Sequence, residues 1–169
     1  MWKVKKSKVH GNGVFASKEI PKNIKIIEYV GDKILKSEGD RRSESRIKKF
    51  LKSKKTGSVY IFELNRKYDI DGFVKRNKAR FINHSCNPNC EVSIEDNKIW
   101  ISSIKKIFIG EELTYDYGYS FDEDYTDHEC LCGSRDCIGY IISQEDLKKY
   151  KKFLQTKISN LDRKIKKNG

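Results

Sequence analysis

The chain has 169 residues, of which 37% are hydrophobic and 36% charged, and its formal net charge is +12. This length predicts one domain with a short appendage, and the apolar content is sufficient for one hydrophobic core. Nine Tyr and eight Phe exclude a fully disordered chain, which would be poor in aromatic residues. No run approaches the about 18 apolar residues of a membrane span, and the basic opening segment lacks the apolar stretch of a secretory signal. We therefore expect an intracellular globular domain that is not secreted and does not act in a membrane.

The charges are distributed unevenly along the chain. Residues 33–55 carry ten Lys and Arg against three acids, and residues 143–169 carry nine against three. Residues 107–134, in contrast, contain eight acids and neither Lys nor Arg. The basic blocks fit either a solvated surface or contact with DNA or another polyanion, because clustered cations supply most non-specific affinity for phosphates. The acidic block favours a basic partner or a metal.

Short β-prone segments separated by turn residues run from residue 25 to residue 104. Residues 25–30 are followed by Gly31 and Asp32, which predicts a strand and then a turn. Residues 36–55 are charged, with few apolar anchors and a weak helical period, and we interpret them as an exposed insert. A hairpin turn is expected at residues 95–97. Four further strands are predicted at residues 59–64, 68–70, 91–94 and 99–104.

The end of the chain has the pattern of an amphipathic helix. Residues 143–146, SQED, resemble a capping box. After them, apolar residues recur at three- and four-residue spacing over about five turns. They are Leu147, Tyr150, Leu154, Ile158, Leu161 and Ile165. Either this face packs back onto the domain, or the helix contacts a partner or nucleic acid through its Lys-rich surface.

The five cysteines point to a metal site. An odd number leaves one thiol over in a framework of disulfides, and a chain without a signal peptide is expected in a reducing compartment. Cys130, Cys132 and Cys137 follow the pattern C-x-C-x4-C, which leaves a tetrahedral zinc site one ligand short. Cys86 and Cys90 are the candidates for the fourth position.

Two segments carry the most specific residue patterns. Residues 80–90, RFINHSCNPNC, crowd three amide side chains into a short loop, which suits binding of backbone or of a polar ligand. His84 lies close to Cys86 in sequence, but thiol catalysis requires that the two side chains meet in space, which sequence adjacency does not arrange. In residues 110–119, GEELTYDYGY, three tyrosines alternate with other residues. They could form a simple strand edge or one wall of an aromatic slot.

Taken together, these segments closely resemble the SET-domain protein-lysine methyltransferases with a post-SET zinc segment. The matching segments occur in the order of that family and cover roughly residues 2–142. They are HGNGVFA at 10–16, IIEYVGD at 26–32, RFINHSCNPNC at 80–90, GEELTYDYGY at 110–119 and ECLCGSRDC at 129–137. The resemblance implies an α+β fold of small, mostly antiparallel sheets with a pseudoknot formed by the segments at 80–90 and 110–119.

The resemblance also implies a division of the chain. Residues 2–119 are expected to form the SET domain, with a variable insert at 36–57. Residues 126–142 would form the post-SET zinc loop, and residues 143–169 a basic C-terminal helix.

Roles for individual residues follow from the same resemblance. S-adenosylmethionine is expected to contact His10, Gly11, Asn12, Gly13, Tyr60, Asn83, His84 and Leu131. Tyr117 matches the catalytic tyrosine of the family, and Tyr115 matches the position that sets how many methyl groups are added. Cys86 is implied as the fourth ligand of a structural zinc ion, beside the three cysteines of the C-x-C-x4-C segment.

Three residues depart from the pattern of the family. Asn23 stands where the family usually has Gly, and Arg76 precedes Asn77 where Gly-Asn is common. Ile138 follows Cys137 where Arg is frequent. Arg76 places the backbone that enters the segment at 80–90 in doubt, but none of the three changes a proposed catalytic atom.

The function implied is transfer of methyl groups from S-adenosylmethionine to a lysine side chain of a basic protein, histone or histone-like, mainly to mono- and dimethyl-lysine. DNA contact through the insert and the C-terminal helix is possible in addition. We expect the nucleus or chromosome in a eukaryotic host and the cytoplasm in a bacterial one. An inactive SET-like reader of basic tails and a zinc-dependent nucleic-acid-binding module are the alternatives.

Overall fold

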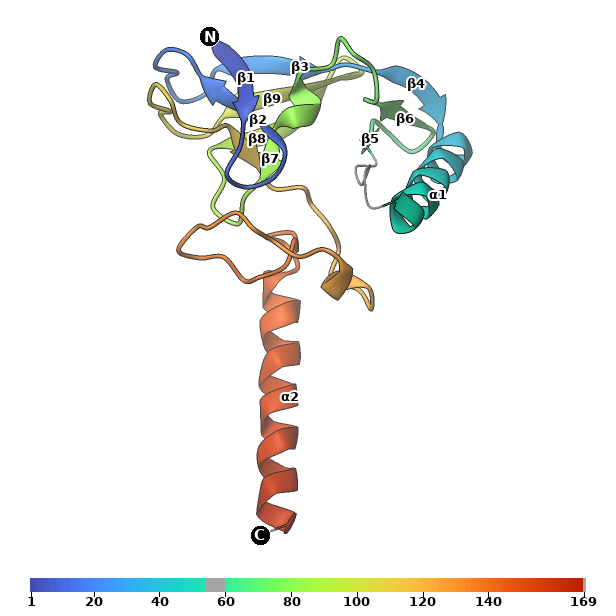
Figure 1. Ribbon diagram of the computed structural model, residues 1–169, viewed down its shortest axis with the longest axis vertical. Coiled ribbons are helices and arrows are strands. Elements are labelled where there is room, and N and C mark those ends of the chain that lie inside the picture. The colour runs from blue at the N-terminus through green and yellow to red at the C-terminus, as the bar shows by residue number, and fades with distance from the viewer. Residues whose placement is uncertain (54–59, 169) are drawn as a thin grey trace. The chain divides into compact units, whose positions relative to one another are not determined.

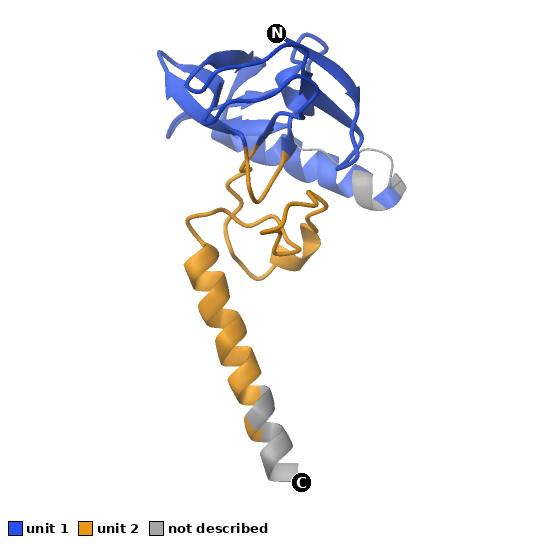
Figure 2. Ribbon diagram, turned by 90° about the vertical axis from the view of Figure 1, so that its left-hand side faces the viewer, with its two compact units in different colours: residues 1–83, 89–114 blue, residues 84–88, 115–169 orange. Residues whose placement is uncertain are grey.

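The protein is described by a computed structural model, which covers residues 1–53 and 60–168 (Figure 1). The chain divides into two compact units, residues 1–83 with 89–114 and residues 84–88 with 115–169 (Figure 2). The boundary runs through two short strands, β7 (Asn83–His84) and β10 (Thr114–Tyr115), which pair with each other. No helix in the described part of the chain has the length and apolar character needed to span a membrane.

The first unit contains three small sheets, in the orders β1-β2, β3-β9-β8 and β4-β6-β5. Every one of these strand pairs is antiparallel. The strands are β1 (Trp2–Lys6), β2 (Asn12–Ala16), β3 (Lys25–Tyr29), β4 (Asp32–Leu35), β5 (Ile61–Glu63), β6 (Tyr68–Asp71), β8 (Cys90–Glu95) and β9 (Lys98–Ser103). A 3-10 turn, η1 (Ala79–Phe81), precedes β7. The expected α+β fold of small antiparallel sheets is confirmed.

The core of the first unit is formed by aliphatic residues of strands and of the segments beside them. Val14, Ala16, Ile20, Ile82, Ile99, Ile101, Ile107 and Leu113 are almost completely buried. Full burial of such a side chain contributes about 1.5–3 kcal/mol. Isolated bridges join Ile20 to Ile107 and Phe15 to Glu112, so residues 107–113 run beside β2. This packing places the backbone of Glu112 beside Phe15 and its carboxylate beside Gly13.

The hairpin between β8 and β9 forms as the sequence predicts. Glu95 pairs with Lys98, and the two residues between them, Asp96 and Asn97, have φ angles of 50° and 58°. Two left-handed residues in a two-residue loop are typical of a type I′ turn, in which Asp and Asn are tolerated. The predicted turn at residues 95–97 is therefore confirmed.

The insert begins with a long helix, α1 (Lys36–Ser53), which lies against β4 and β6 (Figure 1). The side chain of Asp71 in β6 is 3% exposed. It forms ion pairs with the guanidinium groups of Arg42 and Arg46. Arg46 binds in a bidentate manner, with N–O distances of 2.8 and 2.7 Å. Ion pairs to Asp71 thus anchor the helix to β6. The last residues assigned to the insert, 54–57, and the start of the strand predicted at 59–64 lie outside the described residues.

The second unit contains little regular structure besides its C-terminal helix. A 3-10 turn, η2 (Tyr125–Asp127), is followed by the zinc segment and by α2 (Leu147–Asn168). The start of α2 packs through aromatic rings, with centroid distances of 5.4 Å between Phe121 and Tyr150 and 5.3 Å between Phe121 and Phe153. Further along, Leu154 is 36% exposed and Ile158 is 58% exposed. Packing therefore accounts for the first two turns of the predicted apolar face, and Leu154 and Ile158 are exposed. The side chains of Leu161 and Ile165 lie outside the described residues.

Only half of the predicted capping box forms before α2. The backbone N–H of Asp146 donates to Ser143 Oγ at 3.2 Å, as an N-cap does. The reciprocal bond is replaced, because the Ser143 N–H donates to the Tyr119 carbonyl at 2.8 Å. The Asp146 carboxylate instead accepts the N–H of Phe121 at 2.7 Å. The cap therefore also ties the segment after Tyr119 to the start of the helix.

Candidate active site and metal centre

A glycine turn joins β1 to β2 in the first unit. Gly11 has a φ of 51°, in the left-handed region that glycine adopts without strain. The Ser7 N–H donates to the Gly11 carbonyl at 3.1 Å and closes the turn. His10, Gly11 and Asn12 are exposed, so their backbone is open to a ligand.

Asn83 holds this turn from β7. Its Nδ2 lies 3.3 Å from the His10 carbonyl, 3.2 Å from the Asn12 carbonyl and 2.7 Å from Glu112 Oε1. Carbonyls and carboxylates can only accept hydrogen bonds, so the amide must present its nitrogen to them. The structure thus brings together the predicted residues of the glycine turn and Asn83, more than 70 positions apart in the sequence.

Tyr60 has a φ of 56°, which is unusual for a bulky side chain. Its carbonyl accepts the Gly72 N–H at 2.8 Å and the Tyr29 hydroxyl at 3.0 Å. Its ring stacks on Phe73, with centroids 5.6 Å apart and an interplanar angle of 24°. Two donors and one stacking contact therefore hold this residue in a strained backbone conformation, and such strain concentrates at functional sites.

In the second unit, Tyr115, Tyr117 and Tyr119 form a row of rings. The centroids of Tyr115 and Tyr117 are 5.0 Å apart, and those of Tyr117 and Tyr119 are 5.9 Å apart. β10 ends at Tyr115, so a regular strand edge does not account for the row. Tyr115 is 8% exposed and Tyr119 36%, so the row runs from buried to open. Burial raises the pKa of Tyr119 and keeps its hydroxyl protonated.

His84 connects this row to the cysteines within the second unit. Its Nδ1 accepts the backbone N–H of Tyr117 at 3.2 Å, and the two rings meet edge to face at 5.5 Å. Burial lowers the pKa of His84, against the opposing effect of Asp116, and a neutral ring can accept the N–H. His84 Nε2 lies 3.6 Å from Cys86 Sγ. The Cys–His pair therefore does meet in space, contrary to the expectation from sequence, but its sulfur belongs to a four-cysteine cluster.

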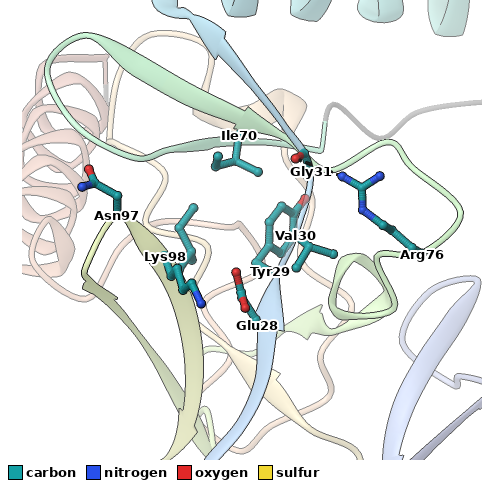
Figure 3. A pocket seen from close by; sticks show the side chains of 9 residues that line it. Glu28, Tyr29, Val30, Gly31, Ile70, Arg76, Asn97 and Lys98 are labelled. Atoms are coloured by element: carbon teal, nitrogen blue, oxygen red, sulfur yellow. Dashed lines mark hydrogen bonds between the residues drawn. The ribbon is translucent and has the colours of Figure 1, made fainter.

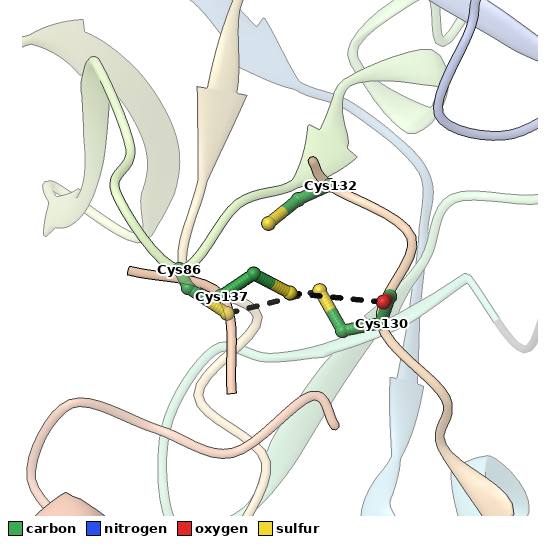
Figure 4. A group of neighbouring side chains, drawn as sticks. All are labelled: Cys86, Cys130, Cys132 and Cys137. Atoms are coloured by element: carbon green, nitrogen blue, oxygen red, sulfur yellow. Dashed lines mark hydrogen bonds between the residues drawn. The ribbon is translucent and has the colours of Figure 1, made fainter. Parts of the chain in front are cut away.

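The sulfur atoms of Cys86, Cys130, Cys132 and Cys137 all lie within 4.8 Å of one another and point toward a common centre (Figure 4). Cys86 Sγ and Cys130 Sγ are 3.7 Å apart. Four thiolates around a tetrahedral zinc ion, with Zn–S bonds of about 2.3 Å, would be about 3.8 Å apart, so the donor set fits zinc. Cys90 is outside the cluster: it is 1% exposed, and its Sγ faces Asn89 Oδ1 at 3.4 Å.

The environment shifts the pKa values of three of the four thiols in opposite directions. Burial raises the pKa of Cys86 to about 11 and raises that of Cys130 further. Burial also opposes ionisation of Cys132, but hydrogen bonds from Ser134 outweigh it and lower the pKa to about 6. Binding of a divalent cation must therefore displace protons from Cys86 and Cys130.

The zinc segment closes on itself around the cysteines. The Cys130 N–H donates to the Gly139 carbonyl at 2.9 Å, and the Ile141 N–H donates to the His128 carbonyl at 2.8 Å. Leu131 stands between two of the cysteines with its side chain 58% exposed. Its apolar side chain offers no polar contact, so a role in cofactor binding would use its backbone and its apolar surface.

Two of the departures from the family pattern have a structural explanation. Asn23 has a φ of 63°, a left-handed conformation that Asn tolerates better than most residues. Arg76 is not among the described residues with positive φ, and its guanidinium reaches the Gly31 carbonyl at 3.3 Å. The backbone before the segment at 80–90 therefore does not depend on a glycine at position 76. No contact of Ile138 explains its replacement of Arg.

A pocket of about 250 Å³ lies elsewhere in the first unit and is lined by polar and apolar residues of several strands (Figure 3). Its lining residues include Glu28, Arg76 and Lys98 but none of the predicted site residues. Sequence reasoning missed Glu112, whose carboxylate contacts Asn83. Two adjacent glutamates gave no signal in a single sequence to distinguish Glu112 from Glu111.

Comparison with known proteins agrees with these observations. Residues 11–118 match the SET domain family. The chain is 35% identical over 136 residues to Histone-lysine N-methyltransferase 2D of Homo sapiens, covering 78% of this chain and 2% of that protein. It is 39% identical over 139 residues to "Histone-lysine N-methyltransferase, H3 lysine-4 specific" of Schizosaccharomyces pombe, covering 80% and 14%. It is 37% identical over 145 residues to "Histone-lysine N-methyltransferase set-2" of Caenorhabditis elegans, covering 83% and 9%. The chain thus spans a small part of these relatives, while the family match covers most of the chain. The protein belongs to the SET domain family.

Proposed function

We propose that this chain transfers methyl groups from S-adenosylmethionine to the side-chain amine of a lysine in a basic protein, a histone or a histone-like protein. The observation that carries the proposal is the SET domain match over residues 11–118, which includes Asn83, Tyr115 and Tyr117. The similar proteins are named histone-lysine N-methyltransferases, and the names of four of them specify lysine 4 of histone H3. The H3 tail is therefore the first substrate to test.

SET methyltransferases use S-adenosylmethionine, and the residues present fit such a cofactor. When bound, it supplies a methyl group on a positively charged sulfur. In the first unit we assign its contacts to His10, Gly11, Asn12, Gly13, Tyr60 and Asn83. In the second unit we assign them to His84 and Leu131. The exposed backbone of the glycine turn and the buried amide that holds it support the first set.

The protein's own residues must prepare and orient the lysine. A lysine amine in water has a pKa of about 10.4, so it must lose a proton before it can attack. A desolvated aromatic wall disfavours the ammonium form, and the row of tyrosines provides one. We assign Tyr117 to orientation of the neutral amine. Its backbone is fixed by the buried ring of His84, which suits a step that depends on alignment.

Tyr115 is proposed to limit the number of methyl groups. It is buried, and its ring lies against that of Tyr117. A tyrosine hydroxyl in such a position can hold a water molecule in the space that a further methyl group needs. Displacing an ordered water without replacing its hydrogen bonds is unfavourable. We therefore infer mainly monomethyl-lysine, with some dimethyl-lysine.

The four cysteines are proposed to hold a structural zinc ion. Four thiolates fill a tetrahedral coordination sphere and leave no position for a substrate. The ion would join the loop after β7 to the segment from Cys130 to Cys137, and it would fix the neighbourhood of His84. Its role would be to order the second unit rather than to take part in the reaction.

A DNA contact is proposed in addition, through exposed cations of the two basic blocks. Lys148, Lys151 and Lys152 of α2 are exposed, as are Arg41, Lys48 and Lys52 of α1. Such a contact would bring the enzyme to chromosomal substrates, in the nucleus of a eukaryotic host or in the cytoplasm of a bacterial one. It would be sequence-independent and sensitive to salt.

The function is tested by incubating the chain with S-adenosylmethionine labelled in the methyl group and a panel of basic proteins that includes histone H3. The proposal predicts label on a basic protein, and a large loss of transfer in Tyr117→Phe with cofactor affinity nearly unchanged. Binding of histone tails without transfer would indicate the reader instead. DNA binding with neither property would indicate the zinc-dependent nucleic-acid-binding module.

A further inference from the structure

The carboxylate of Glu112 accepts hydrogen bonds from two residues that hold the glycine turn in place. Glu112 Oε2 accepts the hydroxyl of Ser7 at 2.8 Å, and Glu112 Oε1 accepts Nδ2 of Asn83 at 2.7 Å. Ser7 and Asn83 lie on opposite sides of the turn in sequence, one before it and the other far after it. All of these residues belong to the first unit.

The support through Ser7 acts on the first half of the turn. Ser7 Oγ accepts the backbone N–H of Val9 at 2.9 Å, and the Ser7 N–H donates to the Gly11 carbonyl at 3.1 Å. A serine hydroxyl has one hydrogen, and its bond to Glu112 uses it. Glu112 therefore fixes the direction of the hydroxyl and, through it, the position of the Val9 amide.

The support through Asn83 acts on the second half. Its amide nitrogen has two hydrogens but three acceptors in reach, namely Glu112 Oε1 and the carbonyls of His10 and Asn12. The carboxylate is the shortest contact and the only charged acceptor of the three, so it orients the amide most strongly. The remaining hydrogen is then left to the two turn carbonyls, at 3.2 and 3.3 Å.

The carboxylate also explains why the turn ends in glycine. A Cβ atom added to Gly13 would lie 2.2 Å from Glu112 Oε1 and 2.9 Å from the ring of Phe15. A shift of the carboxylate away from such a Cβ would break its hydrogen bonds to Ser7 and Asn83. The backbone of the turn can therefore approach the carboxylate closely only at a glycine.

We propose that Glu112 is a positioning residue, which acts through Ser7 and Asn83 to hold residues 10–13 in the conformation that binds the cofactor. This inference rests on the proposed function, because it concerns the same cofactor. Glu112 itself does not need to touch the cofactor or the reacting atoms. Its contribution is to set the directions of the turn carbonyls and amides before a ligand binds.

The test compares Glu112→Ala, Glu112→Gln and Ser7→Ala with Glu111→Ala in the full chain, by calorimetric titration with S-adenosylhomocysteine. Glu111→Ala is the matched control, since it removes the same charge one position away and its carboxylate accepts the exposed Phe108 N–H at 2.7 Å. Loss of the two charge-assisted bonds to Ser7 and Asn83 predicts at least about tenfold weaker binding in Glu112→Ala. Glu112→Gln should recover part of the affinity, because its amide oxygen can still accept from Asn83. Ser7→Ala should weaken binding less than Glu112→Ala.

Two further measurements separate positioning from a general loss of stability. In Glu112→Ala, KM for S-adenosylmethionine should rise while kcat at saturating cofactor is nearly kept, and the unfolding temperature should match that of Glu111→Ala. In the cofactor-free protein, hydrogen exchange of the Val9 amide should be faster in Glu112→Ala and in Ser7→Ala than in Glu111→Ala.

Unchanged affinity and unchanged Val9 exchange in Glu112→Ala, beside a wild type that binds, would overturn the inference and leave the proposed function intact. An equal loss of affinity in Glu111→Ala would also overturn it. A wild-type chain that binds neither S-adenosylmethionine nor S-adenosylhomocysteine contradicts the proposed function instead. Exchange of the Val9 amide then decides whether Glu112 holds the turn.

Discussion

His84 is the residue on which the contacts of the second unit converge. It accepts the backbone N–H of Tyr117 on one ring nitrogen and lies beside Cys86 on the other. Disorder of the cysteine cluster would therefore also shift Tyr117, the proposed catalytic residue, because the buried ring of His84 contacts both. A metal that appears remote from methyl transfer can in this way influence the alignment on which the transfer depends.

At the same scale, Tyr115 is expected to decide product multiplicity. Tyr115→Phe removes one hydroxyl and the water that it can hold, so the space beside the amine becomes available for further methyl groups. We expect the product to shift from mono- toward di- and trimethyl-lysine, with little change in the rate of the first transfer. Mass spectrometry of a peptide with a single lysine measures this distribution. Abundant trimethyl-lysine from the unchanged enzyme would show that Tyr115 does not set the limit.

Among the elements, the zinc segment gives the most direct prediction on metal. The chain should contain one zinc ion per molecule by elemental analysis. Cys86→Ser removes a member of the four-sulfur cluster, so zinc content should fall steeply and cofactor binding should weaken. Cys90→Ser is the control, because the Cys90 thiol lies outside the cluster. Zinc that survives Cys86→Ser but disappears with Cys90→Ser would refute the assignment.

The helix α1 should depend strongly on the carboxylate of Asp71 for its attachment. Asp71→Asn replaces the charged partner of Arg42 and Arg46 with a neutral one, so the free energy of unfolding should fall by about 2 kcal/mol at pH 7. Although burial acts in the opposite direction, the two arginines hold the pKa of Asp71 below its ordinary value. Because the folded pKa is depressed, this stabilisation is present above the unfolded pKa of about 3.9 and is lost as pH falls through the folded value.

The difference between Asp71→Asn and the unchanged chain should therefore shrink as pH falls below about 4, the ordinary pKa of an aspartate. Denaturant titration at several pH values measures it. Asp40→Asn, on an exposed position of α1, is the control and should change little. A difference that stays constant down to the lowest pH would contradict the role of the Asp71 charge.

The helix α2 should contribute to DNA affinity through charge alone. Truncation before the helix is unsuitable as a test, because it would also remove Tyr150 and Phe153 from their aromatic contacts. Replacing exposed Lys148, Lys151 and Lys152 by Gln keeps these contacts. If all three contact phosphates, the slope of log affinity against log salt should decrease by about three. Fluorescence anisotropy with a DNA duplex measures the slope, and an unchanged slope would remove α2 from the DNA interface.

At the scale of the whole molecule, the sequence predicted elements that depend on neighbouring residues better than elements that depend on contacts between distant residues. The hairpin of β8 and β9 was predictable because alternating apolar residues flank a two-residue turn. The helix α1 was described only as an insert, because the ion pairs that anchor it connect residues 25 and 29 positions apart. β4 was missed because it follows the predicted turn directly and has one half-buried side chain, Ile34.

The candidate site also combines features that the sequence predicted with contacts that it did not. Motif order placed the glycine turn, Asn83 and the four cysteines, and the structure brings together the members of each set within one unit. The order of the motifs did not reveal the contact between His84 and Cys86 or the role of Glu112. Both depend on how segments that are distant in sequence pack, and a single sequence does not record this.

The measurement that tests the central claim most directly is mass spectrometry of histone H3 after incubation with the chain and S-adenosylmethionine. The account predicts methyl groups on a lysine side chain, mainly one and sometimes two, and almost none with Tyr117→Phe. Because the variant differs by one hydroxyl, its comparison with the unchanged chain isolates the proposed catalytic residue. Full methylation by Tyr117→Phe, or no methylated lysine on H3 or any other basic protein with a zinc-loaded, cofactor-binding chain, would contradict the account.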